Sequence, residues 1–196
     1  MKRTQLKTLA VVALTMFTFS ISAQVFKFSP KNSSIVINGT SNIHDWKSRT
    51  DQIKGEMVFT DDYQLKSLSL NIPVKSIKSG ERIMDSKTHE TLGAKNNPNI
   101  TFRMTDVTSY SKNGNDIQLV VNGNLTIAGN SRKVAVQAKG KANGSGVYVF
   151  NGDIQLKMTD FGMKPPTALL GTLKVGDQVK LVFDVTLEDN QQAYNN

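Results

Sequence analysis

The sequence predicts an all-β fold, an antiparallel sheet of eight strands that closes into a barrel, with one short helix and one packed loop near the barrel mouth. Three observations support this prediction. From about residue 33 onward, apolar side chains recur at every second position in segment after segment. Only residues 76–99 and 160–177 interrupt this alternation for long. The chain has no cysteine, so no disulfide holds it together, and closure of the sheet is the expected source of stability.

The first 23 residues differ from the rest of the chain. Lys2, Arg3 and Lys7 precede an apolar stretch over residues 9–19, and small and polar residues then lead to Ala23. This order is typical of a secretory signal peptide. We expect cleavage near Ala23, which makes the protein periplasmic or secreted. Loss of the three cations lowers the formal net charge from +8 to +5.

Eight segments alternate apolar and polar side chains, as expected of strands with one buried and one exposed face. In residues 117–127, for example, Leu119 and Val121 share one face, whereas Gln118 and Asn122 share the other. A slip of one residue exposes the whole apolar row, so the pattern also predicts the register. The predicted strands cover residues 33–40, 52–60, 66–75, 100–109, 117–127, 132–140, 147–159 and 178–188.

Links between these strands are rich in Asn and Gly, which accept the positive φ values of tight hairpin turns. Such links cover residues 112–115, 128–131 and 143–146. Glycines inside the strands, such as Gly39 and Gly152, are expected to allow the bends that close a small barrel.

The two longer links predict different structures. Residues 76–99 contain apolar side chains at helical spacing and few β-branched residues, which predicts a helix over about 81–95 that ends before Pro98. Residues 160–177 contain two adjacent prolines and a pair of leucines, which predicts a packed loop.

The remaining chain is expected to form one domain over residues 24–190, followed by a flexible tail over residues 191–196. An eight-stranded barrel is just wide enough either to be filled by its own side chains or to hold one slender ligand. The alternation alone does not show whether the interior is filled by side chains or holds a ligand.

Few residues offer chemistry for catalysis or for a metal ion. His44 and His89 are the only histidines, and without cysteine a zinc site would have to be completed by carboxylates. No Gly-x-Ser-x-Gly motif is present, and no nucleophile stands beside an evident base, so we expect no catalytic residue and no metal site. The lysines are scattered over polar strand faces, which argues against nucleic acid as a partner.

Four motifs occur in order along the chain: residues 34–46 (SIVINGTSNIHDW), residues 83–87 (IMDSK) with Leu92 and residues 97–102 (NPNITF), residues 123–129 (GNLTIAG), and residues 158–163 (MTDFGM) with Gly176, Asp177 and Val179. Together they resemble the YceI-like family of polyisoprenoid-binding periplasmic proteins. The resemblance extends over essentially the whole predicted domain.

This resemblance implies a lipocalin-like barrel that sequesters a long isoprenoid lipid, of the quinone or prenyl phosphate type, in its interior without catalysis. It implies no cofactor other than the bound lipid. Parity then predicts inward-facing residues on the strands, and residues of the two longer links are expected to cap the mouth or to contact the ligand there. The predicted lipid-binding residues are Met57, Phe59, Leu70, Ile72, Met84, Leu92, Phe102, Met104, Leu119, Val121, Phe150, Leu156, Met158, Phe161, Leu169, Leu170, Leu181 and Phe183.

Two alternatives stay open at this point. The first is a barrel with a filled core that serves as an exported structural or interaction module, and the second is a binder of fatty acyl lipids. The cations Lys75, Lys78, Arg82 and Lys87 around the predicted helix can attract a membrane surface, or they can form an ordinary solvated face. The sequence also allows a homodimer.

Overall fold

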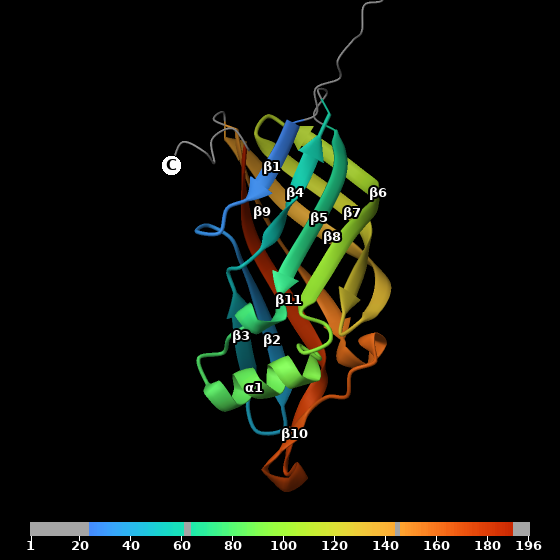
Figure 1. Ribbon diagram of the computed structural model, residues 1–196. Coiled ribbons are helices and arrows are strands. Elements are labelled where there is room, and N and C mark those ends of the chain that lie inside the picture. Colours follow the sequence, from blue (N-terminus) through green and yellow to red (C-terminus); the bar gives the residue numbers. More distant parts are fainter. Residues whose placement is uncertain (1–23, 61–63, 144–145, 190–196) are drawn as a thin grey trace, which may run out of the picture.

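The computed structural model describes residues 24–60, 64–143 and 146–189 (Figure 1), so the predicted signal peptide and the whole of the predicted tail lie outside the described residues. The strands within these ranges are β1 (Gln24–Phe28), β2 (Ser34–Ser41), β3 (Trp46–Thr50), β4 (Lys54–Phe59), β5 (Leu65–Pro73), β6 (Asn99–Asn113), β7 (Asp116–Ile127), β8 (Asn130–Asn143), β9 (Val147–Lys157), β10 (Thr167–Ala168) and β11 (Leu173–Asp189). The helices are α1 (Arg82–Thr91) and the short 3₁₀ helices η1 (Val74–Ser76), η2 (Met158–Phe161) and η3 (Leu169–Gly171). Over the same ranges, no helix has both the length and the apolar character needed to cross a membrane.

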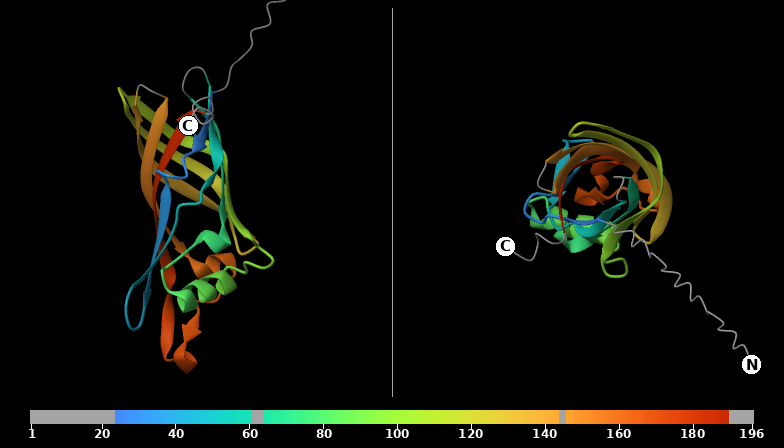
Figure 2. Two further views of the ribbon diagram at one scale, coloured as in Figure 1. Left: turned by 60° about the vertical axis from the view of Figure 1, so that its left-hand side comes forward. Right: turned by 90° about the horizontal axis from the view of Figure 1, so that it is seen from above.

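The sheet closes because β1 pairs antiparallel with β4 on one side and with β11 on the other. The resulting ring runs β1-β4-β5-β6-β7-β8-β9-β11, which confirms the prediction of an eight-stranded antiparallel barrel. Figure 2 shows this ring along its axis.

One edge of β11 serves two strands, since β1 pairs with its end and β2 pairs with its middle. Partners in the two ladders include Phe28 with Leu187 and Val36 with Val182. β2 in turn pairs with β3, and Arg49 of β3 exchanges two backbone hydrogen bonds with Lys78, at 2.7 and 2.8 Å. The wall at the end near α1 is therefore completed by β2, β3 and the segment after η1 (Figure 1).

The prediction missed the short strands β1, β3 and β10. β3 reads Trp-Lys-Ser-Arg-Thr, and its buried positions are Ser48 and Thr50, so no apolar row marks its inner face. β1 has the right alternation but stands directly after the predicted cleavage site, where the sequence gives no preceding turn. The hydrogen-bonded pairing of both strands, which is a tertiary property, creates them.

The helix is shorter than predicted and ends at Thr91. Gly93 has a left-handed φ of 62°, the Gly93 amide donates to the Glu90 carbonyl (2.9 Å), and the Ala94 amide donates to the His89 carbonyl (2.9 Å). These two bonds form a Schellman motif, which terminates a helix at a residue free to adopt positive φ. The hairpin prediction holds at Gly114 and Gly129, whose φ values are 60° and 79°.

The strand glycines mostly serve a purpose other than bending. A side chain at Gly39, Gly123, Gly140 or Gly152 would collide with the ring of Trp46, Phe102, Phe150 or Phe183 respectively, each on an adjacent strand. Each aromatic ring thus lies against bare backbone, close to the barrel wall. In the middle of the barrel, this arrangement keeps the rings of Phe102 and Phe183 close to the wall.

One end of the barrel is filled by an aromatic plug made of Phe26, Phe59, Tyr148 and Phe150. Phe26 and Tyr148 meet edge to face with ring centroids 4.8 Å apart, and Phe59 stacks on Tyr148 at 5.2 Å. Tyr148 and Phe150 are near parallel at 6.3 Å. Such pairs stabilise a core beyond the area that they bury, so this end of the barrel is solid.

The glycine and ring pairs can be tested at Gly140. Replacing Gly140 with Ala pushes its methyl group against the Phe150 ring and is expected to lower the free energy of unfolding by about 1–3 kcal/mol, measured by urea denaturation. In a Phe150→Leu background the same replacement is expected to cost less, because the ring is gone. Equal costs in both backgrounds would contradict the pairing.

Candidate functional site

The barrel is hollow between the aromatic plug and α1. An inner cavity of about 160 Å³ lies next to the plug, and every side chain that lines it is apolar except Thr50. An outer cavity of about 400 Å³ lies beneath α1 and is bordered by β2, β3, η2 and the start of β11. The alternative of a filled interior therefore fits only the end of the barrel that holds the plug.

The two cavities adjoin at a neck formed by five aliphatic side chains that line both of them. These are Ile37, Ile77, Ile100, Ile127 and Leu181. They come from four strands and from the residue after η1. The site is thus an apolar tube that is closed at the plug and reaches the protein surface beneath α1.

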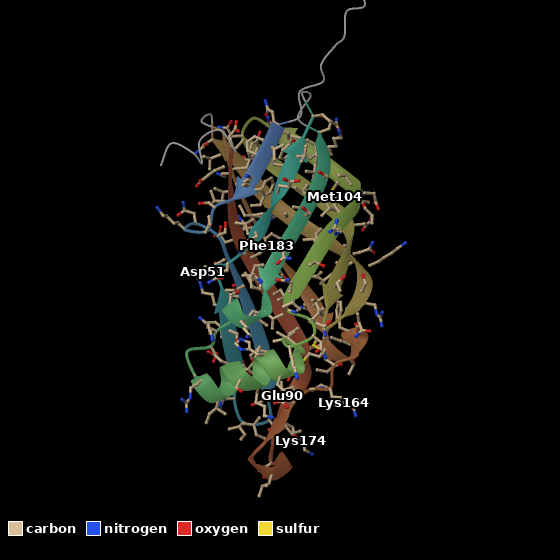
Figure 3. The ribbon with its side chains drawn as sticks, in the orientation of Figure 1. Asp51, Glu90, Met104, Lys164, Lys174 and Phe183 are labelled. Carbon is tan, nitrogen blue, oxygen red and sulfur yellow. The ribbon has the colours of Figure 1, made fainter. Side chains whose placement is uncertain are left out.

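The exposure of inward-facing residues along β11 decreases toward the plug. Leu181 and Phe183 face the interior but are only half-buried, because they border the hollow. Val185 and Leu187 continue the same row and are 7% and 1% exposed. All four side chains line the inner cavity, and they become more buried from Phe183, which lies in the middle of the barrel (Figure 3), toward the plug.

The helix α1 covers the outer cavity with Met84, Thr88 and Leu92 turned toward it, yet none of its residues is buried. Polar contacts hold it in place. The His89 ring nitrogen Nε2 lies 2.9 Å from the Ile77 carbonyl oxygen, and the Asp85 carboxylate accepts hydrogen bonds from Ser79, in the segment that precedes the helix. The cover is therefore attached by a few specific bonds and little apolar packing.

Asp85 is the main anchor of α1. Its Oδ1 accepts bonds from the backbone amide of Ser79 (2.7 Å) and from the Ser79 hydroxyl (2.8 Å), while Lys78 Nζ lies 3.5 Å from Oδ2. The hydrogen bond from the Ser79 backbone is the largest cause that lowers the pKa of Asp85 below its ordinary value of 3.8. The ionised carboxylate is thus the form that holds the helix.

Most polar groups of the site line the outer cavity, and they include the hydroxyl of Ser48, which is buried. Trp46, the sole tryptophan of the chain, donates its indole N–H to the Thr40 carbonyl (3.1 Å) and lines the cavity with His44. Glu81 and Lys87 border the cavity from the side of α1. Across residues 24–60, 64–143 and 146–189, no group of three or more His, Asp or Glu side chains is arranged to hold a metal ion.

A sequence model of the YceI-like domain matches residues 26–187. The chain belongs to the YceI-like family. No curated protein matches it in sequence.

Solved structures share the YceI-like fold at low sequence identity. The crystal structure of Burkholderia cenocepacia BcnA has a TM-score of 0.68 at 20% identity and covers 81% of this chain and 98% of its own. A polyisoprenoid binding domain from Saccharophagus degradans, implicated in plant cell wall breakdown, has a TM-score of 0.67 at 13% identity and covers 85% and 99%. The Campylobacter jejuni YCEI protein has a TM-score of 0.51 at 19% identity and covers 95% and 91%.

Most residues predicted for the site line the tube of this YceI-like barrel. Those that line the inner cavity are Met57, Leu70, Ile72, Phe102, Leu119, Val121, Phe150, Leu181 and Phe183. Those that line the outer cavity are Met84, Leu92, Leu156, Met158 and Leu181. The register expected from the alternation thus places these side chains inside, as predicted.

Five predicted residues lie elsewhere or are not described. Phe59 belongs to the plug and Phe161 is buried in the core, while Met104 packs against the core without lining either cavity. Leu170 points into solvent instead of covering the mouth. The side chain of Leu169 lies outside the part of the chain that the structure describes.

The prediction overlooked several lining residues. Ile37 and Ile100 follow the strand alternation and are recoverable from it, but Ile77 follows a 3₁₀ turn and has no periodic neighbours. Val134, Val136 and Ala138 line the inner cavity from β8, where the alternation of small side chains with Lys and Gln is a weak signal. Thr50 is polar and therefore gives no hydrophobic signal.

The anchor of α1 can be tested through Asp85. Because the folded pKa of Asp85 lies below its unfolded value, its bonds stabilise the fold above pH 3.8 and are lost as the pH falls through the folded pKa. Replacing Asp85 with Ala is expected to lower the free energy of unfolding by about 1.5 kcal/mol at pH 7. The difference from the unchanged protein should shrink at pH 3, measured by urea denaturation at both pH values.

Proposed function

We propose that this protein is an exported, non-enzymatic binding protein that carries or stores a long-chain isoprenoid lipid of the quinone or prenyl phosphate type. The observation that carries this proposal is the apolar tube, which is closed by the aromatic plug and reaches the surface beneath α1. Membership of the YceI-like family supports it.

The dimensions of the tube suit a slender hydrocarbon. The inner cavity is similar in volume to an engineered apolar cavity of roughly 150 Å³ that binds benzene. The outer cavity lies within the range of roughly 300–1,000 Å³ of small-molecule pockets. Each buried CH₂ group contributes about 0.8 kcal/mol, so a long tail is held by burial without any charged partner.

The distribution of polar groups gives the ligand a direction. Apart from Thr50, the inner cavity is lined by apolar side chains, so it accepts the tail. The polar groups that a headgroup can contact, among them His44, Glu81 and Lys87, line the outer cavity. The methionines Met57, Met84 and Met158 adapt their shape to the methyl branches of an isoprenoid. Binding in this way needs no covalent change.

Two observations bear on the alternatives. The hollow argues against a filled interaction module. An empty apolar tube lowers the stability of the fold, and a module that binds partners only on its outer face gains nothing from it. An acyl chain satisfies the same apolar wall, but one similar structure is that of a polyisoprenoid binding domain, which favours the isoprenoid. Export follows from the signal peptide pattern of residues 1–23.

Blocking the neck tests the proposal. Leu181 borders both cavities, whereas its neighbour Val182 points outward from the barrel and is 38% exposed. Replacing Leu181 with Trp is expected to reduce the lipid that co-purifies by tenfold or more in native mass spectrometry, because the indole occupies the path of the tail. The matched Val182→Trp variant should retain the lipid. Equal lipid content in both variants, or none in the unchanged protein, would overturn the proposal.

The emission of Trp46 distinguishes the two classes of lipid. Since this residue lines the outer cavity, a ligand that passes the mouth is expected to shift or quench its fluorescence. Titration with a polyprenol and with a fatty acid of equal carbon number should give the tighter binding for the polyprenol. Tighter binding of the fatty acid would favour an acyl carrier instead.

A further inference from the structure

The three most exposed large apolar side chains of the described residues are Leu170, Ile83 and Ile43, with exposed fractions of 109%, 80% and 55%. They belong to η3, to α1 and to the turn between β2 and β3. These three elements lie together at the end of the barrel opposite the plug (Figures 1 and 2). The outer cavity is bordered by Ile83 itself and by neighbours of the other two, His44 and Leu173. The exposed apolar side chains therefore stand around the mouth of the tube.

The turn that carries Ile43 is fastened to the strand that follows Leu170. The Asn42 side chain donates to the Thr172 carbonyl (2.9 Å) and accepts from the Lys174 amide (2.8 Å), and the Asn42 amide donates to the Lys174 carbonyl (3.0 Å). Three hydrogen bonds thus hold the two projections side by side. The rim is built as one unit.

The backbone at Leu170 is held in an unfavourable conformation. Its φ and ψ values of 58° and 31° are left-handed, a region that a leucine avoids at a cost of roughly 1–2 kcal/mol. Gly171 follows with a φ of 89°. The strain turns a large apolar side chain fully into solvent, and an outlier of this kind points to a function for the exposed group.

Cations surround the same rim. Lys47, Arg82, Lys164 and Lys174 form no ion pair with any residue that the structure describes, whereas Lys78 and Lys87 are paired with Asp85 and Glu90. Figure 3 places Lys164 and Lys174 at this end. The carboxylates of Asp45 and Glu81 also lie here, which leaves an excess of unpaired cations. Lysine and arginine near an anionic bilayer surface favour binding to it.

We propose that the open end of the barrel docks on an anionic membrane surface, with Ile43, Ile83 and Leu170 inserted among the lipid headgroups. This inference rests on the proposed function, because an isoprenoid lipid resides in a bilayer and must leave it to enter the tube. A second copy of the chain fits the rim less well, since it would bring the same unpaired cations against each other. Three separate projections also match a fluid surface better than a rigid one.

Docking in this position joins the tube to the membrane interior. The outer cavity then faces the bilayer, and the hydrocarbon tail passes between two apolar environments without crossing water. This role explains why the three most exposed large apolar side chains of the described residues lie around the mouth.

Flotation with lipid vesicles tests the proposal. The probes are vesicles of phosphatidylethanolamine and phosphatidylglycerol, with pure phosphatidylcholine for comparison. The variants are Ile43→Ser, Ile83→Ser and Leu170→Asn, the last because asparagine tolerates a left-handed backbone. Each is expected to weaken binding to anionic vesicles by about tenfold, and the triple variant to abolish it. Val149→Ser and Val182→Ser, which change the next most exposed apolar side chains, should bind normally.

A second measurement separates this proposal from the proposed function. Lipid loaded from detergent solution should stay bound to a double variant, Ile43→Ser with Leu170→Asn, because neither residue lines a cavity, while transfer of the lipid to vesicles slows by tenfold or more. Loss of lipid from the unchanged protein would contradict the proposed function instead. Normal flotation of the triple variant would overturn the docking proposal. The docking proposal would also be overturned if neither protein floats with vesicles and the unchanged protein forms a dimer that the triple variant cannot form.

Discussion

The pairing of β1 with both β4 and β11 is the constraint on which the rest of this structure depends. These two short ladders join the first and last strands of the domain and turn an open sheet into a barrel. A chain without cysteine has no covalent substitute for them. Closure also pairs both edges of β1, so the same contacts that stabilise the barrel leave this strand no free edge for association with another chain. The interior exists only because the ring is complete.

Side-chain size divides this interior into two regions with different tasks. Aromatic rings fill the end near β1 and β4, where the contacts are dense and stabilising. Farther along the axis, aliphatic side chains line the wall, and the rings of Phe102 and Phe183 lie against glycine backbone instead of meeting at the centre. The side chains around the empty space lack van der Waals contacts that a completely filled barrel would have, which lowers the stability. The solid end compensates for it, so stability and binding occupy different parts of one fold.

The sequence predicted the parts of this structure that depend on alternation. The row containing Leu119 and Val121 is buried in the predicted register, and most of the residues predicted to face inward line one of the two cavities. Alternation could not reveal β3, because its inner face consists of Ser48 and Thr50. Nor could it show which inward residues border empty space. Phe59 and Phe183 both occupy inward-facing positions of an alternating strand. Only the three-dimensional packing places Phe59 in the plug and Phe183 on the wall of the inner cavity.

The way in which α1 is attached determines how often this helix opens compared with how often the whole barrel unfolds. The helix buries none of its residues and is fastened through Asp85 and His89, so displacing it breaks a handful of polar bonds and exposes little hydrocarbon. Removing a barrel strand would instead disrupt ladders on both sides. Local opening of the helix and global unfolding are therefore separate events with very different free energies. The barrel can open and reclose many times during the lifetime of its native state.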